Sequence, residues 1–170
     1  MRNPIEAVVG AAFLLSVAAP ALAAPQWHEK AQAPQPSVSS GECVTNAANY
    51  KVSTDLQKSS SKQFRDVSGT AISFTQGTAG CAEVDFSAEA ATNPGQILVT
   101  RVVLDGSTVC MPGDNLFASD SPSGDLADRA MNYICPSVSA GGHTAKVQFR
   151  SRFGGTVTLD YRTTIVRYMK

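Results

Sequence analysis

Apolar and polar residues alternate one by one through several segments of this chain, and that alternation constrains its fold more than any other feature. In CAEVDFSAE, residues 81–89, the even-numbered residues are apolar while Glu83, Asp85 and Glu89 are acidic. In HTAKVQFR, residues 143–150, the odd-numbered residues form the less polar row. Successive side chains of a β-strand point to opposite faces of the sheet, so both segments are predicted to be half-buried strands.

Turn signals separate these strands from others. The segment QILVTRVVL, residues 96–104, is apolar on both faces and predicts a strand covered on two sides. Asp105-Gly106 follows it, and this dipeptide supports the positive φ angles of a tight hairpin turn, with residues 107–111 as the returning strand. Gly154-Gly155 lies between two alternating runs and predicts a second hairpin.

The inward row changes parity near the end of the chain. Tyr161 and Ile165 are odd-numbered and are expected to face inward, with Arg162 facing outward, whereas Tyr168 in the later inward row is even-numbered. One extra residue in a strand switches the face that later side chains occupy. We therefore predict a β-bulge at residues 163–165.

The remaining segments are less regular. Residues 50–54 and 70–75 are interpreted as strands, residues 111–125 as a long polar loop, and residues 126–135 as a short helix followed by a strand. About seven or eight short strands with turn signals between them predict an all-β chain, an antiparallel β-sandwich of jelly-roll or immunoglobulin-like kind. A small closed barrel is the alternative.

The first residues are interpreted as a targeting segment. Residues 7–19 (AVVGAAFLLSVAA) are an apolar run, and Ala21-Leu22-Ala23 after it suits a signal peptidase. This run is shorter than the roughly 20 residues of a membrane-spanning helix. We predict a signal peptide over residues 1–23, a flexible Pro/Gln/Ser-rich tether over 24–42, and a single domain over 43–170.

Four cysteines follow the predicted cleavage site, and in an oxidising compartment an even number predicts two disulfides. Pairing of neighbouring segments favours Cys43 with Cys81 and Cys110 with Cys135. None of these residues has the C-x-x-C spacing of a zinc or redox site. The chain is therefore expected to be secreted or periplasmic.

The charge balance excludes two classes of partner. The chain has 14 Lys and Arg residues and 14 Asp and Glu residues, so its formal net charge is zero. Nucleic acids and anionic membrane surfaces are recognised by a basic excess, so neither partner is expected. No transmembrane segment after signal cleavage and no cofactor are expected.

His143 is the only histidine of the predicted domain, and no nucleophile stands in an elbow such as G-x-S-x-G. The simpler interpretation is that His143 caps a strand or hydrogen-bonds a loop carbonyl. His143 and the polar residues of the 111–125 loop are nevertheless the candidates for binding a ligand or partner: Asp114, Asn115, Asp120, Asp125 and His143. Calcium is a possible ligand of such a loop, but the D-x-[DN]-x-[DN]-G order is absent and no metal site is predicted.

Charged residues at outward positions have a structural explanation. Glu83 and Asp85 share the outward face of one strand, and cross-strand ion pairs with Lys146 and the arginines account for them. Four arginines are expected to give the C-terminal strands a basic outward side: Arg150, Arg152, Arg162 and Arg167. An aromatic platform for sugars is poorly supplied, because Trp27 lies in the tether and Tyr161 is read as buried.

Three hypotheses of function follow. The first is an exported, non-catalytic binding or interaction module of the bacterial cell envelope or exterior, with a protein or glycan partner bound near residues 111–125. The second is a secreted hydrolase whose site forms in space around His143 and surface carboxylates, with Glu83 and Asp85 as first candidates. The third is a self-assembling envelope component in which an edge strand such as residues 165–169 adds to the next subunit.

Overall fold

The computed structural model describes residues 42–119 and 125–170. The predicted signal peptide, residues 24–41 of the predicted tether and Asp120 lie outside the described residues. The described part consists of strands and loops, and it contains no helix that is long and apolar enough to cross a membrane. This confirms the predicted all-β class.

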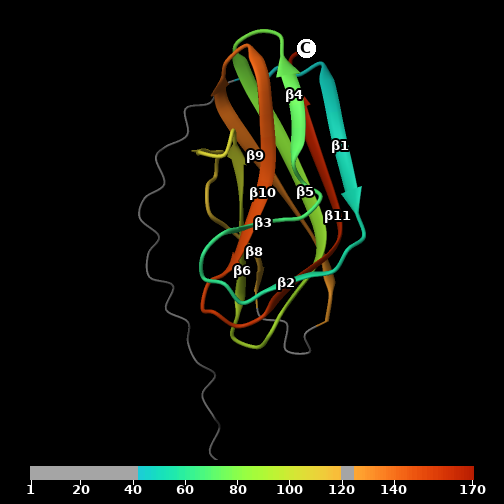
Figure 1. Cartoon of the computed structure of the whole chain (residues 1–170), viewed down its shortest axis with the longest axis vertical. Helices are drawn as coiled ribbons and strands as arrows, with labels where there is room; N and C mark the ends of the chain where they lie inside the picture. The colour runs from blue at the N-terminus through green and yellow to red at the C-terminus, as the bar shows by residue number, and fades with distance from the viewer. Residues whose placement is uncertain (1–41, 120–124) are drawn as a thin grey trace, which may run out of the picture. The chain divides into compact units, whose positions relative to one another are not determined.

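Eleven strands form two antiparallel sheets that pack face to face as a sandwich. In Figure 1 the sheet that contains β4 and β10 lies in front of the sheet that contains β5, β9 and β11. Sheet A consists of β1 (Ala47–Ser53), β2 (Gln57–Ser59), β5 (Gly80–Thr92), β9 (Ala127–Val138) and β11 (Val157–Tyr168). Sheet B consists of β3 (Arg65–Asp66), β4 (Ile72–Gln76), β6 (Ile97–Leu104), β7 (Thr108–Val109), β8 (Asn115–Ser119) and β10 (Gly141–Ser151).

Three positions in the sheets are each filled by two short strands. β1 and β2 both pair with β11, β3 and β4 both pair with β10, and β7 and β8 both pair with β6. With the five single strands they fill eight positions, which explains why about seven or eight strands were expected. Numbered along the chain, these positions run 1-8-3-6 in sheet A and 2-7-4-5 in sheet B, which is the order of a jelly roll.

The apolar side chains of the predicted alternating strands fill the space between the sheets. Ala82, Val84 and Phe86 of β5 are fully buried, and Val147 and Phe149 of β10 face them from the opposite sheet. The outward residues of both strands are partly exposed. Burial of one side-chain row from each strand removes apolar surface from water, which is the main contribution to the stability of a sandwich.

Both predicted disulfides are confirmed. Cys43 is bonded to Cys81, with 5.5 Å between their Cα atoms, and this bond ties the segment before β1 to β5. Cys110 is bonded to Cys135, with 4.4 Å between their Cα atoms. Because Cys110 follows β7 of sheet B and Cys135 belongs to β9 of sheet A, the second disulfide links the two sheets.

The predicted hairpin at Gly154-Gly155 is wrong. β10 pairs with β6 and β4 in sheet B, whereas β11 pairs with β5 and β1 in sheet A, so residues 152–156 cross from one sheet to the other. Alternation shows only that one face of each run is buried, and it is the same whether the next run is a hydrogen-bonded neighbour or lies in the opposite sheet. Gly154 does adopt a positive φ of 94° in this crossing.

The predicted bulge is present, but it lies earlier than expected, between Asp160 and Thr163. Its position reverses two expectations, because Tyr161 is 60% exposed and Arg162 is 1% exposed. Ile165 is accordingly an outward residue, and Thr164 and Val166 face the core. The chemical character of Arg162 favoured an outward position in the sequence pattern, and only the sheet register shows that the extra residue is Tyr161.

Residues 111–135 are more regular than the sequence predicts. The expected polar loop contains β8, whose Phe117 and Ala118 are buried, and the expected short helix is part of the continuous strand β9. Antiparallel pairing of β9 with β5 along residues Ala127 to Val138 overrides the local helical preference of the segment.

We expect Tyr161→Gly to raise the free energy of unfolding by about 0.5–1 kcal/mol. Tyr161 has a φ of 37°, which costs an L-residue about 1–2 kcal/mol, and glycine adopts this conformation without that cost. Urea denaturation measures the change. Thr163→Gly is the control, because Thr163 lies two residues further along β11 and has no positive φ. An equal loss of stability in both variants would contradict the assignment of strain to Tyr161.

Candidate functional site

An open groove of about 650 Å³ lies between the edge strands β1 and β4 on one side of the sandwich. A second hollow of about 370 Å³ adjoins it and shares Asn49 and Ser73 with it. We call the two hollows together the edge groove. Its lining mixes hydroxyl, amide and charged side chains with aromatic ones: Asn49, Tyr50, Lys51, Ser73, Phe74, Thr75, Asp105, His143, Thr144, Tyr168 and Lys170.

The edge groove is open because the inward positions of β1 are polar. Asn49, Lys51 and Ser53 lie opposite Val166, Thr164 and Arg162 of β11, and directly opposite residues of an antiparallel pair share a face of the sheet. All three of these β11 residues are buried, so the β1 residues also face the space between the sheets. Polar side chains at this edge leave a hydrophilic opening where apolar ones would extend the core.

Arg162 is the most unusual of these inward residues. Its Nη1 donates to the Leu159 carbonyl at 3.2 Å, and its Nη2 donates to Ser53 Oγ at 3.0 Å. Burial lowers the pKa of its guanidinium. These hydrogen bonds tie the bulge of β11 to the end of β1, and Arg162 lines neither hollow of the edge groove.

A side-chain hydrogen bond joins the two sheets across the edge groove. Asn49 Nδ2 of β1 donates to the Ser73 carbonyl of β4 at 3.0 Å. The Ser73 and Thr144 hydroxyls lie 3.0 Å apart on neighbouring strands of sheet B. The rings of Phe74 and Tyr168 lie 5.0 Å apart in a tilted arrangement. The edge groove therefore combines polar groups with the aromatic rings of Phe74 and Tyr168.

His143 and Asp105 form one end of the edge groove. Nδ1 of His143 lies 2.7 Å from Asp105 Oδ2, and its Nε2 lies 2.8 Å from the Ser139 carbonyl oxygen. The second carboxylate oxygen of Asp105 accepts the Thr144 N–H at 2.8 Å. A carboxylate and a carbonyl can only accept, so both contacts are satisfied together when both ring nitrogens of His143 carry a proton, and this geometry favours the imidazolium form.

These contacts shift both pKa values. The hydrogen bond to Asp105 raises the pKa of His143, and the same bond lowers the pKa of Asp105. An imidazolium with both protons engaged has no lone pair with which to accept a proton. The Ser139 hydroxyl is 3.5 Å from Nε2, but the proton on that nitrogen is already donated to the Ser139 carbonyl. His143 therefore hydrogen-bonds a loop carbonyl, as the simpler interpretation expects.

The structure does not bring Asp114 or Asn115 of the predicted loop to His143. Asp114 lies 3.8 Å from Arg101 and 3.6 Å from Arg150, and Asn115 Nδ2 lies 3.0 Å from Met131 Sδ. His143 is near the start of β10 and Arg150 near its end, seven residues or about 23 Å of strand away. Asp125 is exposed before β9. Within residues 42–119 and 125–170, no three His, Cys, Asp or Glu residues are grouped as a metal site.

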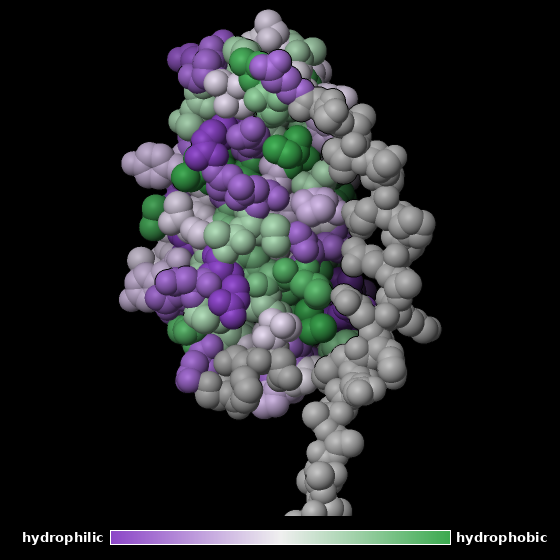
Figure 2. All heavy atoms as spheres, turned by 180° about the vertical axis from the view of Figure 1, so that it is seen from behind, coloured by the Kyte–Doolittle hydropathy of each residue, from purple (hydrophilic) through white to green (hydrophobic). Residues whose placement is uncertain are grey.

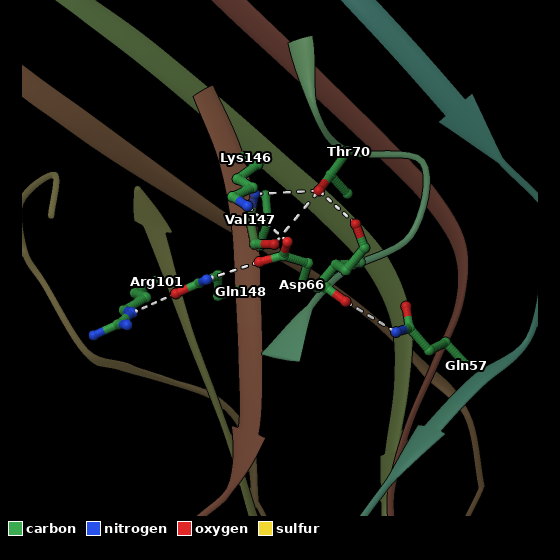
Figure 3. A network of polar contacts seen from close by, with 8 residues as sticks. Gln57, Asp66, Thr70, Arg101, Lys146, Val147 and Gln148 are labelled. Carbon is green, nitrogen blue, oxygen red and sulfur yellow. Dashed lines mark hydrogen bonds and ion pairs between the residues drawn. The ribbon is translucent and has the colours of Figure 1, made fainter. Parts of the chain in front are cut away.

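Polar residues on the outer face of sheet B form a connected network (Figure 3). Asp66 accepts hydrogen bonds from Lys146 at 2.6 Å and from Gln148 at 2.7 Å, and Gln148 in turn accepts one from Arg101 at 2.9 Å. The Arg101 guanidinium also lies 3.9 Å from the centre of the Phe64 ring. These contacts attach β3 and its flanking loop to β10. The predicted pairing of Lys146 and Arg150 with Glu83 and Asp85 is wrong, because Lys146 pairs with Asp66 and Arg150 with Asp114, on the other sheet.

The residues proposed for a hydrolase are also separated. Glu83 and Asp85 lie on the outer face of sheet A, whereas His143 belongs to sheet B. Asp85 is paired with Arg167 on that face. Figure 2 views this side of the molecule and shows hydrophilic and hydrophobic residues interspersed. The expected basic side is absent from the described residues, because Arg162 is buried and Arg167 and Arg150 lie on different sheets.

Sequence reasoning missed most of the edge groove. Asn49 lies just before the strand predicted at residues 50–54, Ser73 belongs to a segment interpreted only as a strand, and Asp105 was interpreted only as a turn residue. Tyr50 is 73% exposed, although its facing could not be assigned from sequence. The available signal was the polar residue at every second position of β1, which becomes informative once β1 is known to be an edge strand.

Comparisons with known proteins do not assign the chain. No family model and no curated protein sequence matches it. Its fold is similar to part of a family GH115 4-O-methyl-α-glucuronidase with specificity for decorated arabinogalactans, at TM-score 0.37 and 19% identity over 59% of this chain and 13% of that one. It is also similar to infectious bursal disease virus (Gx strain) at TM-score 0.42 and 12% identity, over 78% of this chain and 36% of that one.

A third similar structure is a carbohydrate-binding module of Cellvibrio mixtus lichenase 5A in complex with cellotriose. Its TM-score is 0.32, with 13% identity over 71% of this chain and 97% of that one. The chain thus spans only a minor part of the first two structures. With TM-scores below 0.5 and identities below 20%, these likenesses establish neither a family nor a function for this chain.

We expect the contact between His143 and Asp105 to stabilise the fold most between about pH 4 and about pH 6.5. A raised histidine pKa stabilises the fold fully below the unfolded pKa, and this contribution is lost as pH rises through the folded pKa. A lowered aspartate pKa contributes above the unfolded pKa, and its contribution is lost as pH falls through the folded pKa. His143→Gln should therefore lose more stability at pH 5.5 than at pH 9, measured by urea denaturation.

The control is the same substitution in an Asp105→Asn background. There the carboxylate is absent, and the effect of His143→Gln should be smaller and nearly independent of pH. A loss of equal size at both pH values in the unmodified background would show that the imidazolium contact is not what His143 contributes.

Proposed function

We propose that this chain is an exported, non-catalytic binding module, and that the edge groove binds an uncharged, hydroxyl-rich ligand such as a glycan chain. The observation that carries the proposal is the composition of the groove. It is open, it offers hydroxyl and amide groups from both sheets, and an exposed tyrosine, Tyr50, borders its second hollow.

The hydroxyl and amide groups of the rim favour a hydroxyl-rich ligand, and Lys51 and Lys170 also line the edge groove. Ser73, Thr75 and Thr144 carry hydroxyls that both donate and accept, and the Asn49 amide does the same. Sugar hydroxyls have the same dual capacity, so such a rim can exchange hydrogen bonds with a glycan without burying an unpaired charge. Tyr50 borders the second hollow from the outer face of sheet A, since its register partner Ile165 is an outward residue. It adds an exposed flat ring with a polar tip, the kind of side chain that is enriched where a protein contacts a partner.

The state of His143 favours binding over hydrolysis. General base catalysis needs an unprotonated nitrogen within hydrogen-bond distance of the reacting group. Both nitrogens of His143 donate to fixed acceptors, and Glu83 and Asp85 lie on the other sheet. A hydrolase would have to break the contact with Asp105 or with Ser139 before His143 could act.

Export is part of the proposal. Both disulfides join segments that are far apart in sequence, 38 and 25 residues, and such bonds persist in oxidising compartments. A periplasmic or extracellular location is compatible with this and with the leader predicted from sequence. At the cell envelope or outside the cell, the module would encounter polysaccharides or glycosylated proteins.

We expect Tyr50→Ala to weaken glycan binding about tenfold or more, because truncating an exposed anchoring tyrosine commonly costs at least about 1.4 kcal/mol of binding free energy. The measurement is a screen on an array of neutral, acidic and amino-sugar oligosaccharides, followed by titration calorimetry with the tightest neutral binder. Tyr161→Ala is the matched control, since Tyr161 is also exposed but lines neither hollow.

Two outcomes would overturn the proposal. One is an array on which no neutral oligosaccharide binds. The other is an equal loss of affinity in Tyr50→Ala and Tyr161→Ala. Hydrolysis of a bound oligosaccharide that stops in His143→Ala would instead support the second hypothesis, a secreted hydrolase.

A further inference from the structure

The two edges of sheet A differ in how well they are covered. β11, which was expected to offer an edge at residues 165–169, lies between β1 and β5 and cannot accept another strand. β1 is faced by β4 across the edge groove. β9, the other edge, pairs with β5 on one side only.

Part of β9 presents free backbone groups. The N–H and C=O of Ile134 are bonded to Met111, at 2.9 and 2.7 Å, on the side away from β5. Alternate residues of a strand point their backbone groups to the same side, so those of Asp128, Ala130 and Asn132 also point away from β5. Among the described residues no backbone group bonds to these three residues on that side, although the Arg129 side chain donates to the Asp128 carbonyl.

We propose that β9 pairs antiparallel with β9 of a second copy of this chain, with the twofold axis at Ala130, so that two sheets A join into one continuous sheet. Its three outward residues would form three hydrogen-bonded pairs: Asp128 with Asn132, Ala130 with Ala130, and Asn132 with Asp128. The guanidinium of Arg129 leaves the Asp128 carbonyl when the partner strand arrives.

The register follows from what blocks the alternatives. An axis at Met131 or Asn132 places the partner strand against Ile134, which Met111 already occupies. An axis at Arg129 or Asp128 places two like charges directly opposite each other, which is destabilising. The axis at Ala130 avoids both problems, because Asp128 faces the Asn132 amide and Arg129 faces Met131.

Side chains on this edge are compatible with close approach. Asp128, Ala130 and Asn132 are exposed and lie on the outer face of sheet A, where their register partners on β5 are Glu89, Ser87 and Asp85. Ala130 at the axis has no side chain beyond Cβ to collide with its counterpart. Such a short pairing buries much less than the roughly 800 Å² per partner of a stable interface, so association should be weak and depend on concentration.

The test is the mass of the purified full chain by light scattering, from micromolar to millimolar concentration. We expect the mass to rise from that of one chain toward that of two. Ala130→Lys and Ala130→Glu should each keep the mass of one chain, because two like charges then meet at the axis. An equimolar mixture of these variants should restore the rise to two chains.

Ala48→Lys is the matched control, because Ala48 is an exposed alanine on β1 at the opposite edge of the same sheet. This variant should associate as the unmodified chain does. The proposal is wrong if the unmodified chain keeps the mass of one chain throughout, if it grows beyond two chains, if Ala130→Lys leaves association intact, or if Ala48→Lys abolishes it. None of these outcomes depends on whether the edge groove binds a glycan.

Discussion

Each strand of this domain must bury one row of side chains between the two sheets, and the other features of the structure follow from how that requirement is met. In β5 and β10 apolar residues at every second position meet it directly. In β11 the inward row changes from odd to even residues. The bulge between Asp160 and Thr163 makes this change possible by placing Tyr161 in solvent and Arg162 inside. In β1 the inward row is polar, so the core ends there and the edge groove begins.

The end of the edge groove is organised by one carboxylate. Asp105 and Gly106 both have positive φ, 52° and 78°, in the tight turn that joins β6 to β7. This turn places the carboxylate where it accepts hydrogen bonds from the Thr144 N–H and from Nδ1 of the His143 imidazolium. The turn after β9 is attached in the same way, through Nε2 of His143 and the Ser139 carbonyl. A histidine that resembles a catalytic base in the sequence thus connects two turns and shapes one end of the edge groove.

The local sequence pattern was sufficient to predict the buried rows of two strands, one turn and both disulfides. Alternation identified the buried rows of β5 and β10, the Asp105-Gly106 dipeptide identified its turn, and the spacing of the cysteines identified both disulfides. The Gly154-Gly155 segment was misread because alternation carries no information about which strand is the neighbour. The predicted facings of Tyr161 and Arg162 were the reverse of those observed, because a one-residue bulge leaves no local signal of its position.

The candidate site was less predictable, since it is made of residues whose meaning depends on the strand order. Asn49 and Ser73 become site residues only because β1 and β4 are edge strands on the same side of the sandwich. The polar loop at residues 111–125 attracted attention through its composition, but Asp114 is engaged by Arg101 and Arg150.

The central claim, that the contacts of His143 favour its imidazolium form over the free base, is tested most directly by nitrogen-15 NMR of its ring during a pH titration. We expect both ring nitrogens to be protonated at pH 6 and the titration midpoint to lie above the ordinary value of about 6.5, because Asp105 and the Ser139 carbonyl both accept from the ring. A ring with one unprotonated nitrogen at pH 6, titrating below 6.5, would contradict the account and leave His143 available for proton transfer.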